Sequence, residues 1–212
     1  VMWDDLIDYF ESGSKDPYFM GSMVMIQRDE RSYEVIDGQQ RLTTILLLFA
    51  AAKCVLKDTS IKLEDKGGVS QEEMDIFLRD NIDELERLIF NRTSNIGHFV
   101  SEKRVRIQRG IGFDFDQVLK VALSCESENS ILVPNQTSEE ERAIIRRYFA
   151  NLDFFVQKIK EYFTPNLKYT AENLTRLSAF LAFLRFRIGI IRIIASSFNA
   201  AYQIFEILNN RG

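Results

Sequence analysis

The sequence has few of the residues from which metal centres and catalytic triads are built. Its 212 residues include two cysteines, Cys54 and Cys125, and a single histidine, His98. The two cysteines have neither the spacing of a metal site nor that of a disulfide framework, so we expect two reduced thiols. One histidine is too few for a Cys/His metal centre or a histidine-based triad, and the sequence disfavours both classes of site.

Long apolar runs and an excess of positive charge are also missing. The longest apolar run, Ile45 to Ala52, is too short to span a bilayer, and the acidic start Val1-Met-Trp-Asp-Asp5 is unlike a secretory signal. We therefore expect a cytoplasmic protein with no membrane contact. The net charge of −4 argues against a domain that covers a nucleic-acid backbone, although a local basic patch is compatible with it.

Hydrophobic residues make up 46% of the chain, which is enough for a substantial core. Apolar spacing predicts helices over 3–11, 39–57, 72–81, 113–123, 138–163, 170–184 and 199–208. It predicts strands over 18–27, 33–36, 86–92, 103–109 and 187–194. The fold class is therefore α+β. We expect a small α/β unit over 1–57, a mainly helical section with a hairpin over 58–184, and a strand and helix over 185–212 that return to the first unit.

The stretch Tyr33-Glu-Val-Ile-Asp-Gly-Gln-Gln-Arg-Leu-Thr-Thr44 has the pattern of a strand, a glycine turn and the start of a long helix. Such a junction directs unpaired backbone N–H groups and the positive end of the helix dipole at one point, which favours an anion. Arg41, in the first helical turn, could grip a phosphate with its forked guanidinium. Asp37 could cap the helix or hold a metal. Asp-Gly is also a common turn sequence before a helix, with no ligand involved. The glycine run of a P-loop is missing.

This stretch resembles the signature of the GmrSD-type restriction endonuclease N-terminal domain, a branch of the ParB/sulfiredoxin-like superfamily. The segment Tyr18-Phe-Met-Gly-Ser-Met-Val-Met-Ile26 stands where the family has an apolar strand. A second family signature is similar to Ala201-Tyr-Gln-Ile-Phe-Glu-Ile-Leu-Asn-Asn-Arg-Gly212. The resemblance implies a ParB/sulfiredoxin-like core of mixed sheet and helices beside a mainly helical section. It also implies an Arg-containing motif upstream and an HNH-type nuclease half downstream.

By this resemblance, Asp37, Gly38, Gln39, Gln40 and Arg41 line a site for the phosphates of a nucleotide, and Gly38 to Arg41 fits the superfamily pattern Gly-x-x-Arg. Gly38 would let the backbone approach a phosphate, and Arg41 would neutralise its charge. Gln39 and Gln40 would donate hydrogen bonds or orient an attacking water. Asp37 would hold Mg²⁺ or act as a base.

Three weaker candidates lie further along the chain. Thr44 is a candidate nucleotide ligand, although a threonine inside a helix usually bonds its own backbone. Asn209 and Arg211 belong to the second signature, and by resemblance they would close over the same ligand from the opposite side. Asn-Asn-Arg-Gly is also an ordinary end of a helix.

The resemblance implies a nucleotide-binding and NTP-hydrolysing sensor in a prokaryotic, modification-dependent restriction system that defends against phage. The ligands would be Mg²⁺ and GTP, ATP or another nucleoside triphosphate, and DNA would bind through the full-length protein. Two alternatives stay open. One is a direct metal-dependent nuclease with Asp37 as a metal ligand, although two-metal cleavage usually needs more than one carboxylate. The other is a non-catalytic DNA- or protein-binding module. Enzymatic activity, the identity of the nucleotide and the number of copies are left open.

Overall fold

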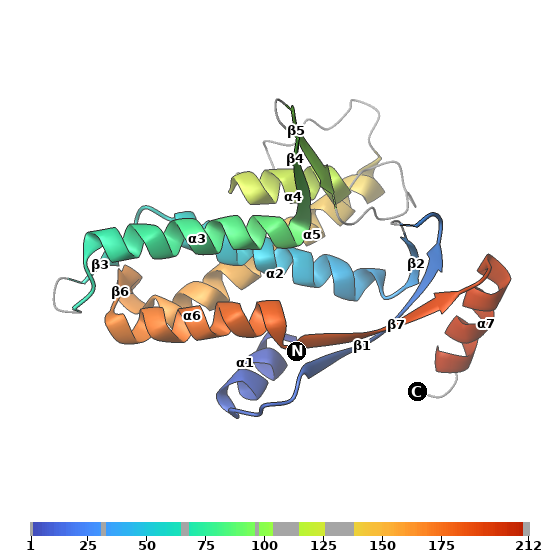
Figure 1. Cartoon of the computed structure of the whole chain (residues 1–212), viewed down its shortest axis with the longest axis horizontal. Helices are drawn as coiled ribbons and strands as arrows, with labels where there is room; N and C mark the ends of the chain where they lie inside the picture. Colours follow the sequence, from blue (N-terminus) through green and yellow to red (C-terminus); the bar gives the residue numbers. More distant parts are fainter. Residues whose placement is uncertain are drawn as a thin grey trace.

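The molecule consists mainly of a cluster of helices and a small three-stranded sheet. The computed structural model describes residues 2–30, 33–64, 68–95, 98–103, 115–125 and 138–209. Most helices gather around α2 (Gln39–Lys57), and a ribbon of strands leads away from them to α7 (Phe198–Asn209) (Figure 1). The fold is α+β, as predicted from the apolar spacing.

The sheet joins strands from the two ends of the chain. Its order is β2-β1-β7, formed by Tyr33–Asp37, Tyr18–Gln27 and Ile188–Ala195. β1 and β2 form an antiparallel hairpin, whereas β7 runs parallel to β1, from Tyr18 opposite Ile188 to Ile26 opposite Ala195. The late strand thus lies beside the first hairpin, although the whole helical section separates them in the sequence. The proposed boundaries of the three chain segments remain a prediction.

α2 is the central helix of the core. It is buried at nearly every position from Ile45 to Leu56, and α3 (Gln71–Ile89), α4 (Phe115–Ser124) and α5 (Glu139–Phe163) pack against it. By length and composition α2 could cross a membrane, but 67% of its apolar window is buried inside the fold. A helix surrounded by other helices is expected to be apolar on all sides, so packing accounts for its composition.

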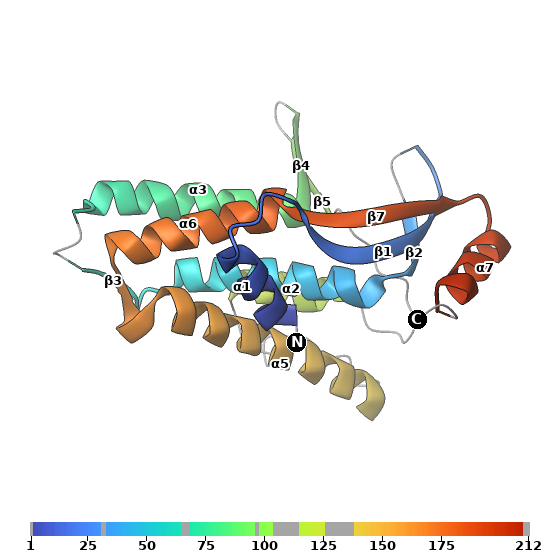
Figure 2. The ribbon, with the colours of Figure 1, turned by 90° about the horizontal axis from the view of Figure 1, so that it is seen from below.

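Aromatic side chains hold α1 (Met2–Glu11) against α6 (Ala171–Phe186). The ring centroids of Trp3 and Phe180 lie 5.8 Å apart in an edge-to-face arrangement, and those of Phe10 and Phe180 lie 5.4 Å apart. Phe180 also contacts Phe163 at the end of α5, at 4.9 Å. Figure 2 shows α1 beside these helices. The start of the chain is therefore part of the main core.

Short elements and a cap fix the ends of the long helices. β3 (Lys62–Leu63) pairs in parallel with β6 (Lys168–Tyr169), which directly follows the 3₁₀ helix η2 (Pro165–Leu167). At the start of α5, the Ser138 hydroxyl accepts from the Glu141 N–H at 3.2 Å, and the Glu141 carboxylate accepts from the Ser138 N–H at 2.7 Å. This is a capping box of the Ser-x-x-Glu type.

α3 is longer than its sequence pattern predicts. The apolar spacing indicates a helix over 72–81 and a strand over 86–92, but the helix continues to Ile89. Leu85 and Ile89 lie one helical turn apart and both are buried. The strand prediction over 86–89 is wrong because helical packing of these two side chains overrides a short apparent alternation.

The predicted hairpin follows α3. β4 (Phe90–Asn95) pairs antiparallel with β5 (His98–Lys103), and Asn95 lies opposite His98. The turn is therefore where the sequence places it. The predicted strand over 103–109 lies outside the described residues, except for Lys103.

Candidate functional site

The candidate site is the junction between β2 and α2. β2 ends at Asp37, and Gly38 is the N-cap of α2 in the left-handed conformation, with φ +92° and ψ 8°. The first helical hydrogen bond runs from the Leu42 N–H to the Gly38 carbonyl at 3.1 Å. No side-chain cap hydrogen bond is found at this helix N-terminus among the described residues. The interpretation of Asp37 as a helix cap is therefore wrong, because Asp37 still belongs to the sheet, opposite Val24.

Met23 of β1 packs against the turn so closely that only glycine fits at position 38. A Cβ atom at this position would lie 2.7 Å from Met23 Cγ and 3.4 Å from Met23 Cα, and Met23 is 2% exposed. Glycine is also the residue that most easily adopts a positive φ. The tight turn therefore depends on Gly38 for both its backbone conformation and its fit against β1.

Replacing Gly38 by alanine is expected to lower the free energy of unfolding by about 2 kcal/mol, because the new methyl group adds a clash to a strained backbone. Urea denaturation followed by circular dichroism measures the change. The matched control is Gly13→Ala, since Gly13 also has a positive φ of +63° but nothing within 4 Å of the added Cβ. Equal losses in the two variants would show that Met23 does not restrict the turn.

Arg41 is held beside this turn by the neighbouring strand. Its Nη1 atom donates to the Ser22 carbonyl at 2.6 Å and lies 3.9 Å from Asp37 Oδ2. The guanidinium crosses Gly21, where an added Cβ would lie 3.3 Å from Arg41 Cζ. The side chain is 46% exposed. The structure thus places a partly solvated positive charge next to the start of α2.

The sequence reasoning missed this supporting role of β1. Gly21 has φ +110°, and the pairing of β1 with β7 shifts register between Phe19 and Ser22. An isolated glycine inside a strand often marks a bulge or a close approach. Gly21 within the apolar strand of the first hairpin was the available signal.

The other residues at the start of α2 have different surroundings. The Gln39 amide donates to the Val35 carbonyl at 2.8 Å, which ties the helix back to β2. Gln40 is exposed, and its carbonyl accepts from the Thr44 hydroxyl at 2.7 Å. Thr44 therefore makes the bond to its own helix that its position predicts. Of the two glutamines, Gln40 is the one that lies open to solvent.

The second signature lies on the same sheet. Ala201 and Ile204 of α7 pack with Val24 and Ile26 of β1 and with Ala195 of β7. Asn209 is the last residue of α7. Arg211 lies outside the described residues. The two signatures therefore meet at one small sheet, with α7 on the strand that neighbours β2.

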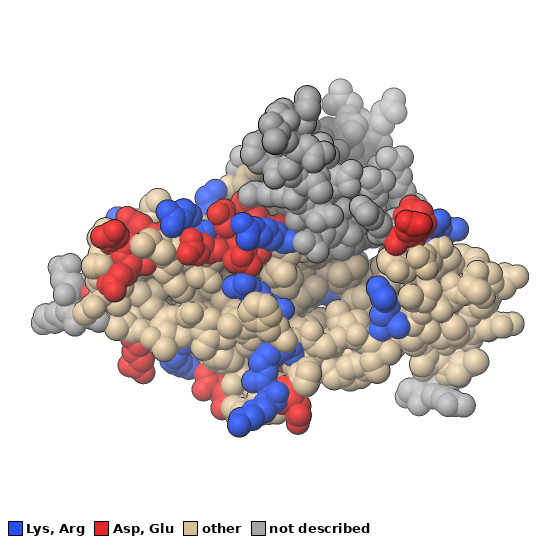
Figure 3. All heavy atoms as spheres, in the orientation of Figure 1, with Lys and Arg blue, Asp and Glu red and all other residues tan. Residues whose placement is uncertain are grey.

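Charged residues of both signs cover the face shown in Figure 3. Lys and Arg are interspersed with Asp and Glu over the helices, and mostly uncharged side chains cover β7 and α7. Several arginines in the described part of the chain are engaged with carboxylates: Arg146 with Glu139 at 3.1 Å and Arg185 with Glu84 at 2.7 Å. This mixture is unlike the continuous basic surface of a domain that covers a nucleic-acid backbone.

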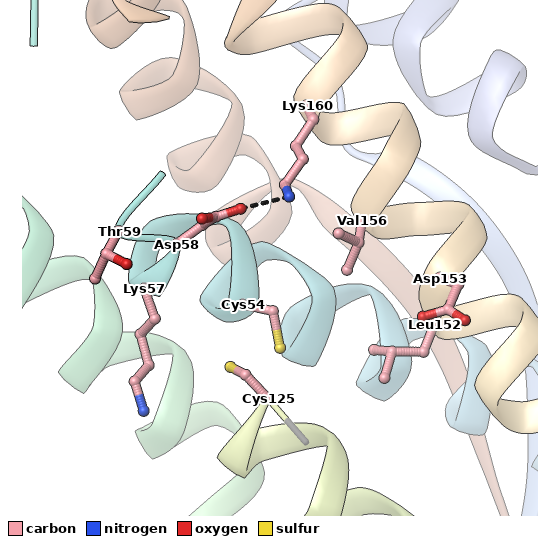
Figure 4. Close-up of a pocket in the computed structure, with 9 residues that line it drawn as sticks. All are labelled: Cys54, Lys57, Asp58, Thr59, Cys125, Leu152, Asp153, Val156 and Lys160. Carbon is pink, nitrogen blue, oxygen red and sulfur yellow. Dashed lines mark ion pairs between the residues drawn. The ribbon is translucent and has the colours of Figure 1, made fainter. Parts of the chain in front are cut away.

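A pocket of about 390 Å³ lies in the helical section, away from the predicted site. Cys54, Lys57, Cys125, Asp153 and Lys160 are among the residues that line it (Figure 4). Cys54 and Cys125 are far apart in the sequence, so spacing gave no sign that they would share a pocket.

The fold and the junction define an α+β domain in which a strand, a glycine turn and a helix present one arginine beside the helix start. A family model described as the GmrSD restriction endonuclease N-terminal domain matches residues 1–212. The chain belongs to this family, as its two signatures predict, and membership indicates a role in a restriction endonuclease system. A search of curated proteins found no match.

Proposed function

We propose that the chain binds a nucleoside triphosphate with Mg²⁺ at the β2–α2 junction and hydrolyses it. In this role it is the sensor and regulatory part of a modification-dependent DNA restriction system, and nucleotide hydrolysis controls cleavage by an HNH-type nuclease half. The observation that carries the proposal is the positive charge at the start of α2.

The start of α2 differs from those of α1, α3, α5 and α6, whereas α7 likewise has no acidic residue in its first turn. The first turns of α1, α3, α5 and α6 each carry acidic residues, which complement the positive end of the helix dipole. The first turn of α2 carries no acidic residue, and Arg41 stands there instead. An arginine near this end of a helix is unfavourable, and the Asp37 carboxylate, 3.9 Å from Arg41 Nη1 and partly exposed, offsets part of this charge. A bound phosphate would offset both the dipole and the guanidinium.

The neighbouring side chains complete the proposed site. Asp37, whose side chain is 27% exposed, would hold Mg²⁺. No group of three or more His, Cys, Asp or Glu side chains suited to a metal is found among the described residues. The ion would therefore take most of its oxygen ligands from the phosphates and water, as Mg²⁺ commonly does. Gln40 would orient the attacking water. Asn209 and Arg211, in the second signature, would close over the nucleotide.

A thermal-shift panel of nucleoside triphosphates with Mg²⁺ tests this function. A ligand at 100 times its Kd stabilises the native state by about 2.7 kcal/mol, which corresponds to a rise in Tm of roughly 5–10 °C for a chain of this size. Phosphate release measured on the same samples reports hydrolysis. The proposal fails if no nucleotide raises the Tm. Nicking of plasmid DNA with Mg²⁺ alone, lost in Asp37→Asn, would identify a nuclease, and a shift with modified DNA alone would identify a binding module.

A further inference from the structure

The pocket in the helical section contains a pair of facing thiols. Cys54 lies near the end of α2, and Cys125 directly follows α4. Figure 4 shows the two sulfur atoms pointing toward each other. The Cys54 thiol donates to the Ala122 carbonyl at 3.1 Å, and the Cys125 sulfur is a second hydrogen-bond partner of the same thiol. Two distant parts of the chain thus bring their thiols into contact.

The backbone at Cys125 contributes to this arrangement. Cys125 has φ +60°, a left-handed conformation, and its N–H donates to the Ala122 carbonyl at 3.1 Å. A single left-handed residue commonly ends a helix. The same turn ends α4 and leaves the Cys125 side chain on the pocket wall opposite Cys54.

The two thiols differ in burial and in charge. Cys125 is exposed, whereas Cys54 is half-buried. The hydrogen bond from Cys54 and the positive charges of Lys57 and Lys53 lower the pKa of Cys125 to about 7. The same hydrogen bond and burial raise the pKa of Cys54. Cys125 therefore ionises more readily than Cys54, and the thiolate is the reactive form.

Two acidic residues also line the pocket, Asp58 and Asp153. Asp58 Oδ2 is ion-paired with Lys160 Nζ at 2.5 Å, so this carboxylate and this ammonium offset each other. Asp153 lines the same pocket from α5. The pocket volume of about 390 Å³ admits a small oxidant.

We propose that Cys125 and Cys54 form an oxidation site for hydrogen peroxide or a small organic hydroperoxide. The Cys125 thiolate attacks the peroxide oxygen, the O–O bond breaks, and the products are the Cys125 sulfenic acid and hydroxide or alkoxide. The Cys54 sulfur then attacks the Cys125 sulfur and displaces hydroxide. That hydroxide takes the Cys54 proton and leaves as water. The product is a disulfide that links α2 to the end of α4.

Mass spectrometry of the peroxide-treated protein tests the proposal. The expected product is a monomer with a Cys54–Cys125 cross-linked peptide and a mass about 2 Da below that of the reduced chain. Before oxidation, alkylation at pH 7 is expected to be about tenfold faster at Cys125 than at Cys54. These measurements use the unaltered protein and do not depend on how a variant folds. Only intermolecular disulfides, or faster alkylation of Cys54, would overturn the proposal.

Two matched variants assign the order of the steps. In Cys54→Ser, the Cys125 sulfenic acid has no resolving thiol, so a dimedone adduct at Cys125 is expected. In Cys125→Ser, Cys54 is expected to stay reduced under the same treatment. Circular dichroism confirms that each variant is folded. A dimedone adduct at Cys54 in the second variant, with none at Cys125 in the first, would reverse the roles and reject the assignment.

Discussion

Replacing Arg41 by alanine is expected to weaken nucleotide binding by about 10- to 100-fold while the fold persists. A hydrogen bond to a charged group contributes about 1.5–3 kcal/mol, and each 1.4 kcal/mol corresponds to a factor of ten in affinity. In the free protein, Arg41 donates a hydrogen bond to the Ser22 carbonyl and lies 3.9 Å from the Asp37 carboxylate. Its side chain is 46% exposed, so its loss should change stability by less than about 1 kcal/mol. Isothermal titration calorimetry with Mg²⁺ and the nucleotide measures the affinity.

Two further variants test whether the loss of affinity comes from the Arg41 guanidinium in particular. Arg146→Ala removes another exposed arginine, one that pairs with Glu139 at the start of α5, and should leave the affinity unchanged. Arg41→Lys keeps the charge but loses the fork, so we expect an intermediate affinity. Unchanged affinity in Arg41→Ala, in a protein that unfolds at the same urea concentration as the original, would refute the proposed site.

The sequence predicts the local structure of the β2–α2 junction better than it predicts the surroundings of that junction. The strand, glycine and helix were evident because Val35 and Ile36 lead into Asp-Gly and then a long apolar run. The contact of Arg41 with Ser22 is not evident from the sequence, because it joins α2 to β1 at the point where the register of β1 shifts. A hydrogen bond between distant backbone and side-chain atoms leaves no periodic signal in the sequence.

The fold shows the same contrast between local and long-range order. The Ser138 capping box and the uniformly apolar α2 are local patterns, and both predict structure correctly. The apolar spacing predicts too short an α3, because the burial of Leu85 and Ile89 depends on the helices packed around them. The contact between the two thiols cannot be predicted from the sequence at all. Cys54 and Cys125 have no informative spacing, and their side chains come together only when α2 and α4 pack.

Lys53 provides the largest expected effect on stability. It is 5% exposed, yet its ammonium donates to Glu86 Oε1 at 2.5 Å and to the Leu123 carbonyl at 2.8 Å. It therefore connects α2, α3 and α4 from inside the core. Lys53→Ala is expected to lower the free energy of unfolding by about 3 kcal/mol, because it leaves a largely buried carboxylate without its lysine partner. That is a large fraction of the total stability of a typical domain. Urea denaturation monitored at 222 nm measures it.

The control for Lys53 is Lys168→Ala. Lys168 also pairs with a glutamate, Glu64, but at 3.4 Å and with 53% of its side chain exposed, so less than about 1 kcal/mol should be lost. A second test removes both buried charges. Lys53→Met combined with Glu86→Leu should recover most of the stability, because apolar side chains can replace a buried ion pair at little cost. If Lys53→Ala and Lys168→Ala lose the same free energy, the buried ammonium contributes no more than a surface charge. The packing of α3 and α4 on α2 would then rest on apolar contacts alone.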